Sequence, residues 1–259
     1  MIFHRIAIAL RRQDWLAFAI ELVLVVVGIL IALQIDNWNT IRKERDEEKQ
    51  YLAAITSELE ANSKRLLDLI QFNERYLESV NLIIASLEKA PGDVDREALT
   101  EAFGLTLNLS ATRLNSGVYD ELVSAGKLQL LQSSTLRQDL ISYYRSLNST
   151  AQLEATSLAN WQASYTPFLE EHFNTQIMFQ AWAADFSQTL NYQPPVSLHI
   201  RPLAEDTFWE LPAESPTKRR FGNLLSRLFS DHLYSHYAQQ DLLELTRKLL
   251  LDIQTNVDV

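Results

Sequence analysis

The first pattern along the chain is a long run of apolar residues near its N-terminus. From residue 16 to residue 35, Glu21 and Gln34 are the strongly polar exceptions among 20 positions. At ~1.5 Å rise per residue, a helix of this length spans roughly 30 Å, which is the thickness of the hydrocarbon core of a bilayer. The pattern therefore predicts a single transmembrane anchor over residues 15–38.

Aromatic residues mark both ends of the predicted anchor. Trp15 and Trp38 lie where interfacial tryptophans are expected, at the two headgroup levels. A cleaved signal peptide is the alternative, because Arg11 and Arg12 precede the apolar run. The run is longer than the usual ~7–15 residues and ends without a small-x-small cleavage site, which favours an uncleaved anchor.

Positive charges near the anchor indicate its orientation. Arg5, Arg11 and Arg12 are nearly unopposed upstream, whereas the cations that follow the anchor alternate with acidic residues. Since unopposed cations favour the cytoplasmic side, we expect residues 1–14 to form a cytoplasmic or interfacial segment. Residues 39–259 would then be exported, and they would be periplasmic if the anchor lies in a bacterial inner membrane.

The second pattern is a seam of residues spaced three or four apart, typical of one face of a long helix. It predicts a helix over residues 41–89 that ends at Pro91. Asn62 and Asn73 interrupt the apolar seam, either to specify register in a bundle or where a neighbouring helix leaves room for water. The pattern leaves open whether the anchor helix continues into this one. The seam positions are Leu52, Ile55, Leu59, Asn62, Leu66, Leu69, Asn73, Tyr76, Val80, Ile83 and Leu87.

Local signals predict further helices and one irregular segment. Five of the seven prolines fall between residues 194 and 216, which predicts a flap over 191–216 that packs on the rest of the chain. The expected fold is all-α, with a single N-terminal transmembrane helix followed by an elongated antiparallel helical bundle over 39–259. The other predicted helices are about 95–109, a short helix ended by Gly126, one capped by Ser133 or Ser134 that runs to about 161, one from Thr166 that ends before Pro194, and one from Pro216 to about Asp252.

Charge and composition exclude several classes of function. The formal charge is −10, and since residues 1–38 are balanced it lies on residues 39–259, so nucleic acid is not an expected partner. The chain has no cysteine, which excludes disulfides, thiolate nucleophiles and cysteine-ligated metals. Its 6 glycines are too widely spaced for a phosphate-binding loop.

Two stretches resemble a known family. VVGILIALQIDNWNTIRKE at 26–44 and VYDELVSAGKLQLLQSSTLRQDLISYY at 118–144 are similar to the paired signatures of an uncharacterised bacterial membrane family, domain of unknown function 6090. The resemblance implies a single anchor followed by a helical domain. The family has no established activity, so the resemblance implies no catalytic residue.

Candidate metal ligands are few. His232 and His236 are spaced four apart on one predicted helical face, with Glu170, Glu171 and His172 as conceivable partners. Zinc or iron needs a third and a fourth ligand from another helix. The alternative is a pair of partly exposed histidines on an amphipathic helix, and we expect neither a metal nor another cofactor.

A group of aromatic residues forms a second candidate site. Trp161, Phe179, Trp182 and Trp209 could line a pocket for a small apolar ligand, with the segment 191–216 as its lid. Large aromatic residues more often fill gaps between helices, which is the alternative.

Within the anchor, Glu21, Val25, Gly28 and Ala32 recur every three or four residues and so share one helical stripe. Small residues such as Gly28 and Ala32 let two membrane helices approach closely, and intramembrane carboxylates usually face protein. The stripe predicts association with a second copy or with the span of another membrane protein. The alternative is that Glu21 reaches headgroup water by snorkelling.

These patterns favour a membrane-anchored helical scaffold or accessory subunit that acts through protein contacts and has no catalytic activity. Its expected partners are the lipid bilayer and either a second copy or another membrane protein. Two alternatives remain at this point. One is a ligand-sensing module with the aromatic pocket, and the other is a metal-dependent enzyme that uses His232 and His236.

Overall fold

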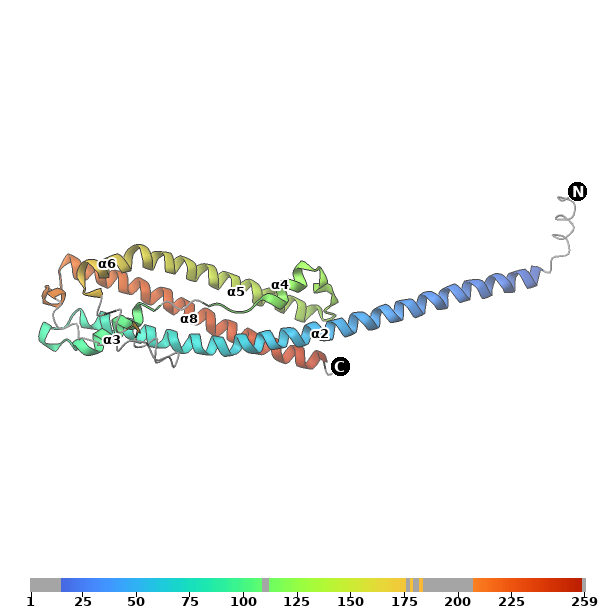
Figure 1. The fold of residues 1–259 in the computed structure, drawn as a ribbon, viewed down its shortest axis with the longest axis horizontal. Helices are drawn as coiled ribbons and strands as arrows, with labels where there is room; N and C mark the ends of the chain where they lie inside the picture. The colour runs from blue at the N-terminus through green and yellow to red at the C-terminus, as the bar shows by residue number, and fades with distance from the viewer. Residues whose placement is uncertain (1–14, 109–111, 176–177, 179–181, 184–206, 258–259) are drawn as a thin grey trace, which may run out of the picture.

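The computed structural model describes residues 15–108, 112–175, 178, 182–183 and 207–257. Within these ranges the chain is helical and contains no strand. The predicted all-α class is therefore confirmed. Three long helical segments lie side by side as an elongated bundle, and one of them extends well beyond it (Figure 1).

The helix that extends is α2, which runs without interruption from Trp15 to Ser86 over 72 residues. It joins the predicted anchor to the predicted seam helix, which answers the question left open by the sequence. No glycine or proline lies between residues 29 and 90, so nothing in the backbone breaks the helix. Residues 20–46 are exposed throughout, and Figure 1 shows this part of α2 as a lone helix leaving the bundle.

The remaining elements follow local signals closely. The side chain of Asp95 caps α3 by accepting hydrogen bonds from the backbone N–H groups of Glu97 and Ala98, and Ser133 caps α5. Gly126 has φ 67°, a left-handed conformation that glycine adopts without strain, and it ends the turn after α4. The elements are η1 (Pro91–Asp93), α3 (Arg96–Thr106), α4 (Gly117–Ser124), η2 (Lys127–Leu130), α5 (Ser134–Asn160), the π-helix η3 (Trp161–Tyr165), α6 (Thr166–His172), η4 (Thr207–Glu210) and α8 (Pro216–Val257).

Several helix ends differ from the expectation, and α8 runs to Val257, five residues beyond Asp252. The helix expected to reach residue 109 ends at Thr106. The helix that begins at Thr166 ends at His172, well short of Pro194, because Phe173 is extended (φ −134°, ψ 157°). This conformation places the Phe173 ring in the core against Phe208, with 4.6 Å between centroids. Beyond this break the described residues 175, 178, 182 and 183 are helical again. Most of the predicted flap, residues 191–206, lies outside the described residues.

The bundle has two hydrophobic cores, one at each end. The proximal core, near the point where α2 leaves the bundle, is built around residues 52–66 of α2, 136–147 of α5 and 242–253 of α8. The distal core contains residues 76–87 of α2 and 221–228 of α8, together with α3 and α6. All eleven positions of the predicted seam are buried. The seam is therefore the face by which α2 packs on α8 and the smaller helices.

Candidate functional site

A layer of polar side chains crosses the bundle between the two cores. It consists of Asn73 from α2, Thr112 from the segment before α4, Glu154 from α5, and His232 and Gln239 from α8; we call these five residues the polar layer. Asn73, Thr112 and Gln239 are almost fully buried, at 3%, 3% and 1% exposure. Buried polar groups at this depth require hydrogen-bonding partners.

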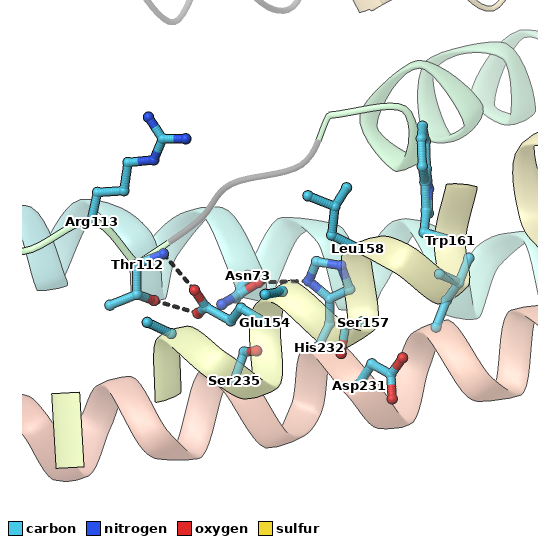
Figure 2. Close-up of a pocket in the computed structure, with 13 residues that line it drawn as sticks. Asn73, Thr112, Arg113, Glu154, Ser157, Leu158, Trp161, Asp231, His232 and Ser235 are labelled. Carbon is cyan, nitrogen blue, oxygen red and sulfur yellow. Dashed lines mark hydrogen bonds between the residues drawn. The ribbon is translucent and has the colours of Figure 1, made fainter. Parts of the chain in front are cut away.

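The polar layer is joined by one chain of hydrogen bonds. The backbone N–H of Thr112 donates to Glu154 Oε2 at 2.6 Å, and the Thr112 hydroxyl donates to Oε1. Gln239 Nε2 donates to the Thr112 hydroxyl oxygen at 2.8 Å, and Asn73 Nδ2 donates to Gln239 Oε1 at 2.8 Å. His232 Nδ1 lies 2.8 Å from Asn73 Oδ1. Figure 2 shows the two ends of this chain, at Thr112 and at His232.

The direction of this chain determines which nitrogen of His232 carries the proton. A carboxylate only accepts hydrogen bonds, so the amide nitrogen of Gln239 faces Glu154 and its oxygen faces Asn73. The Asn73 amide is oriented in the same sense, with its oxygen toward His232. His232 Nδ1 is therefore the donor, and Nε2 of the neutral ring keeps a free lone pair.

The surroundings of His232 favour this neutral form. Its ring stacks on the ring of Tyr76, with 3.6 Å between centroids and 19° between planes. Burial lowers the pKa of His232 from 6.5 to about 4, because the protonated ring loses hydration. At neutral pH the side chain is thus an uncharged acceptor at Nε2.

A cavity of 360 Å³ adjoins the polar layer. His232 and Asp231 lie on its α8 side, Glu154 and Leu158 on its α5 side, and Trp161 also lines it. The indole Nε1 of Trp161 donates to the carbonyl of Thr106 at 3.2 Å. The cavity therefore combines apolar walls with hydrogen-bond acceptors.

A second set of buried polar groups ties α4, the chain just before it and α5 to α2. Asn62 Nδ2 donates to the carbonyl of Asn115 at 2.8 Å, and Asn62 Oδ1 accepts from the Asn115 N–H at 2.7 Å. Glu58 accepts from the backbone N–H of Val118 at 2.9 Å and from the hydroxyl of Tyr144 at 2.5 Å. Both seam asparagines thus bind protein groups, in line with a register role rather than room for water.

The structure does not bring the candidate metal ligands together. Among the described residues, no group of three or more His, Asp or Glu side chains could hold a metal ion. His232 Nδ1 is already bound to Asn73, and His236 is 9% exposed rather than partly exposed as expected. Glu170 and Glu171 are exposed, and His172 packs against Phe168 and Phe208.

The four predicted pocket aromatics separate in the structure. Trp161 lines the cavity, whereas Trp209 is fully buried in the distal core and Trp182 packs against that core. Phe179 lies outside the described residues. The cavity adjoins the polar layer, which no local sequence pattern indicates, because its members come from four separate segments.

The predicted association stripe of the anchor is accessible. Glu21, Val25, Gly28 and Ala32 are all exposed, and a Cβ added at Gly28 would meet no atom within 4 Å. Trp38 is 63% exposed. Trp15 is the first residue of α2, and the structure does not describe its side chain.

A family model described as "Family of unknown function (DUF6090)" matches residues 21–172, more than half of the chain. The matched range contains both stretches that carried the resemblance. No curated protein and no solved structure matches the chain.

Proposed function

The chain belongs to a family of unknown function (DUF6090), and from its own geometry we propose that it is a membrane-tethered helical module. In this proposal it acts as a scaffold or accessory subunit through contacts with other proteins and has no catalytic activity of its own. A single observation supports the proposal most directly. One helix, α2, is both an apolar rod and a contributor to the two hydrophobic cores of the bundle.

The apolar part of α2 is exposed on all sides. Between Ile20 and Ile35 the exposed fractions of the large apolar residues range from 43% at Val27 to 66% at Leu24. It is the one described helix long and apolar enough to cross a membrane, a test that signal sequences also pass. A bilayer would cover this surface. Because the segment is helical, its backbone N–H and C=O groups bond one another, as a membrane-spanning segment requires.

Retention of this segment, rather than its removal as a signal peptide, is supported by its continuity with the bundle. The same helix supplies residues 52–87 of the seam, and the family match begins inside the apolar segment, at residue 21. Bundle contacts begin at Glu47, which pairs with Lys127 of η2, and at Glu48, which accepts from the N–H of Gln132. Since Trp38 precedes Glu47 by nine residues, the bundle would lie roughly 14 Å from the headgroup level.

We propose no catalytic activity, and this is supported by the buried polar groups, which form hydrogen bonds with one another. Glu154, Asn73 and Gln239 are engaged with one another and join α2, α5 and α8. Such a network stabilises the helix packing. Protein contacts would then be made by the tether and by the acidic outer surface of the bundle.

We predict that the tether associates through its small-residue stripe. Single cysteines introduced at 21, 25, 28 and 32 of this cysteine-free chain should form crosslinks in membranes, because these positions share one helical face. Since α2 has no break, crosslinking should continue with helical spacing at Ile35, Asn39, Arg42 and Asp46. Crosslinked species would be separated by non-reducing electrophoresis and identified by mass spectrometry.

Cysteines at Val23 and Leu30, on the opposite face, provide the matched control and should crosslink weakly. Gly28→Ile should reduce crosslinking several-fold along the stripe, because the branched side chain prevents close helix approach. Equal crosslinking on both faces, unchanged by Gly28→Ile and by Glu21→Leu, would contradict association and leave Glu21 as a snorkelling residue.

We also propose that the bundle faces the periplasm of a bacterial inner membrane, since Arg5, Arg11 and Arg12 favour a cytoplasmic N-terminus. Protease added to intact spheroplasts should then digest residues 50–259, and an epitope tag placed before residue 1 should be protected. Protection of the bundle until the spheroplasts are lysed would reverse this orientation.

A further inference from the structure

The wall of the cavity beside the polar layer carries two carboxylates, those of Asp231 and Glu154, and the neutral ring of His232. Nε2 of His232 is an acceptor whose orientation is imposed by the hydrogen bond at Nδ1. Asp231 also lines the cavity, and among the described residues its carboxylate has no ion pair. Glu154, the third acceptor, is already bound to Thr112 and Gln239.

The charged groups of the wall are mostly acidic, and the hydroxyl groups of Ser157 and Ser235, which have no partner among the described residues, carry no charge. The indole N–H of Trp161 is bound to the carbonyl of Thr106, and one amide hydrogen of Asn73 is bound to Gln239. Arg113 is the one cation on the wall of this cavity; it is exposed and its guanidinium is directed away from the polar layer (Figure 2). A bound molecule that supplies donors and positive charge would complement the site, whereas an anion would face Asp231 and Glu154.

Apolar side chains line the rest of the cavity. Leu158 and Leu228 lie on opposite helices, and the ring of Trp161 lines the same space. An aromatic ring face also attracts a cation, through the negative charge density of its π system. Ala151 and Ala155 are exposed residues of the α5 wall, so the cavity opens to solvent there. A volume of 360 Å³ lies at the small end of the range for ligand sites.

The geometry points to a binding site for a small molecule with a primary ammonium group and an apolar body, the ammonium group facing His232 and Asp231 and the body facing Trp161. This site goes beyond the proposed tethering function. It differs from the aromatic pocket expected from the sequence, because it is formed around the polar layer. Of the aromatic residues expected in that pocket, Trp161 is the one that lines this cavity. Occupancy would join α5 to α8 through one ligand.

Three probes of matched size test the charge preference: 2-phenylethylammonium, the neutral 2-phenylethanol and the anionic 3-phenylpropionate. Binding to the full chain in mild detergent micelles at pH 7 would be measured by isothermal titration calorimetry. We expect the cation to bind at least about tenfold more tightly than the alcohol, as a charge-assisted hydrogen bond would provide. The anion should bind no more tightly than the alcohol.

Substitutions in the cavity wall test whether the ammonium probe binds there. Asp231→Asn keeps the shape of the side chain and should weaken cation binding at least about tenfold. His232→Phe keeps a ring on Tyr76 but removes the acceptor, and a similar loss is expected provided that its circular dichroism matches the parent. Ala155→Trp should block the cavity, whereas Thr156→Trp, an exposed neighbour that does not line it, should leave binding unchanged.

Three results would overturn the site. One is equal affinity for the three probes. Another is cation binding that neither Asp231→Asn nor Ala155→Trp reduces, which would place the probe in the micelle or elsewhere on the protein. The third is the lack of saturable cation binding up to about 1 mM. Ala155→Trp and Asp231→Asn change an exposed wall and a half-buried carboxylate, so neither result depends on a disrupted core.

Discussion

Replacing Leu59 by alanine is expected to lower the free energy of unfolding of the bundle by about 2–5 kcal/mol. Leu59 lies on the seam of α2, is fully buried and belongs to the proximal core. Removing its side chain forfeits the transfer of apolar surface from water and leaves a space between tightly packed helices. Urea unfolding of the full chain in mild detergent would measure this change in free energy, with unfolding followed by the loss of the helical circular dichroism signal.

Leu67→Ala provides the matched control on the same helix. Leu67 is 44% exposed, so the same chemical change should cost well under half as much. The comparison also tests the register of α2, because a rotation that exposed Leu59 would bury positions such as Leu67. Equal losses for the two variants would contradict the burial of Leu59 and the exposure of Leu67.

Acidification is expected to destabilise the bundle through His232. The ring has a pKa of about 4 in the folded chain and an ordinary value of 6.5. Because the unfolded chain binds this proton more readily, the stability from keeping the ring neutral is fully present above pH 6.5 and is lost as the pH falls toward 4. The difference between the two pKa values corresponds to about 3 kcal/mol across this window.

The variant His232→Gln isolates this effect. Glutamine retains an amide that can donate to Asn73 but does not titrate, so the variant should be less sensitive to pH between 6.5 and 4. His172 and His236 remain in both proteins, so their contributions cancel in the comparison. Urea midpoints measured at several pH values would give both slopes. Parallel slopes for the parent and His232→Gln would show that His232 is not held in its neutral form.

Much of the fold could be predicted from local sequence, because the responsible interactions lie within one or two helical turns. The period of the apolar residues identified the seam, and every seam position proved to be buried. Gly126 and Ser133 acted as the expected turn and cap residues, and Asp95, where the helix was expected to begin, caps α3. The end of α6 was not predictable, because the extended Phe173 is held by packing against Phe208, 35 residues later in the chain.

The candidate site could not be predicted in the same way. Asn73 and Gln239 are 166 residues apart, and no sequence period relates them to Thr112 or Glu154. The sequence did single out Asn73 and His232, but as a seam interruption and as a metal candidate. Their roles became clear when the structure placed His232 Nδ1 2.8 Å from Asn73 Oδ1, while among the described residues no further His, Asp or Glu side chains join His232 in a group that could hold a metal ion.

By itself the sequence determined the helical class, the apolar segment and the face by which α2 packs, because hydrophobic periodicity encodes which side of a helix leaves water. The tertiary structure alone decided that Asn73, Gln239, Thr112 and Glu154 form one chain, and that His232 presents Nε2 beside a cavity. The reason is physical. A buried polar group must be paired, but its partner is chosen by the axial positions and rotations of separate helices, which packing of both cores sets together.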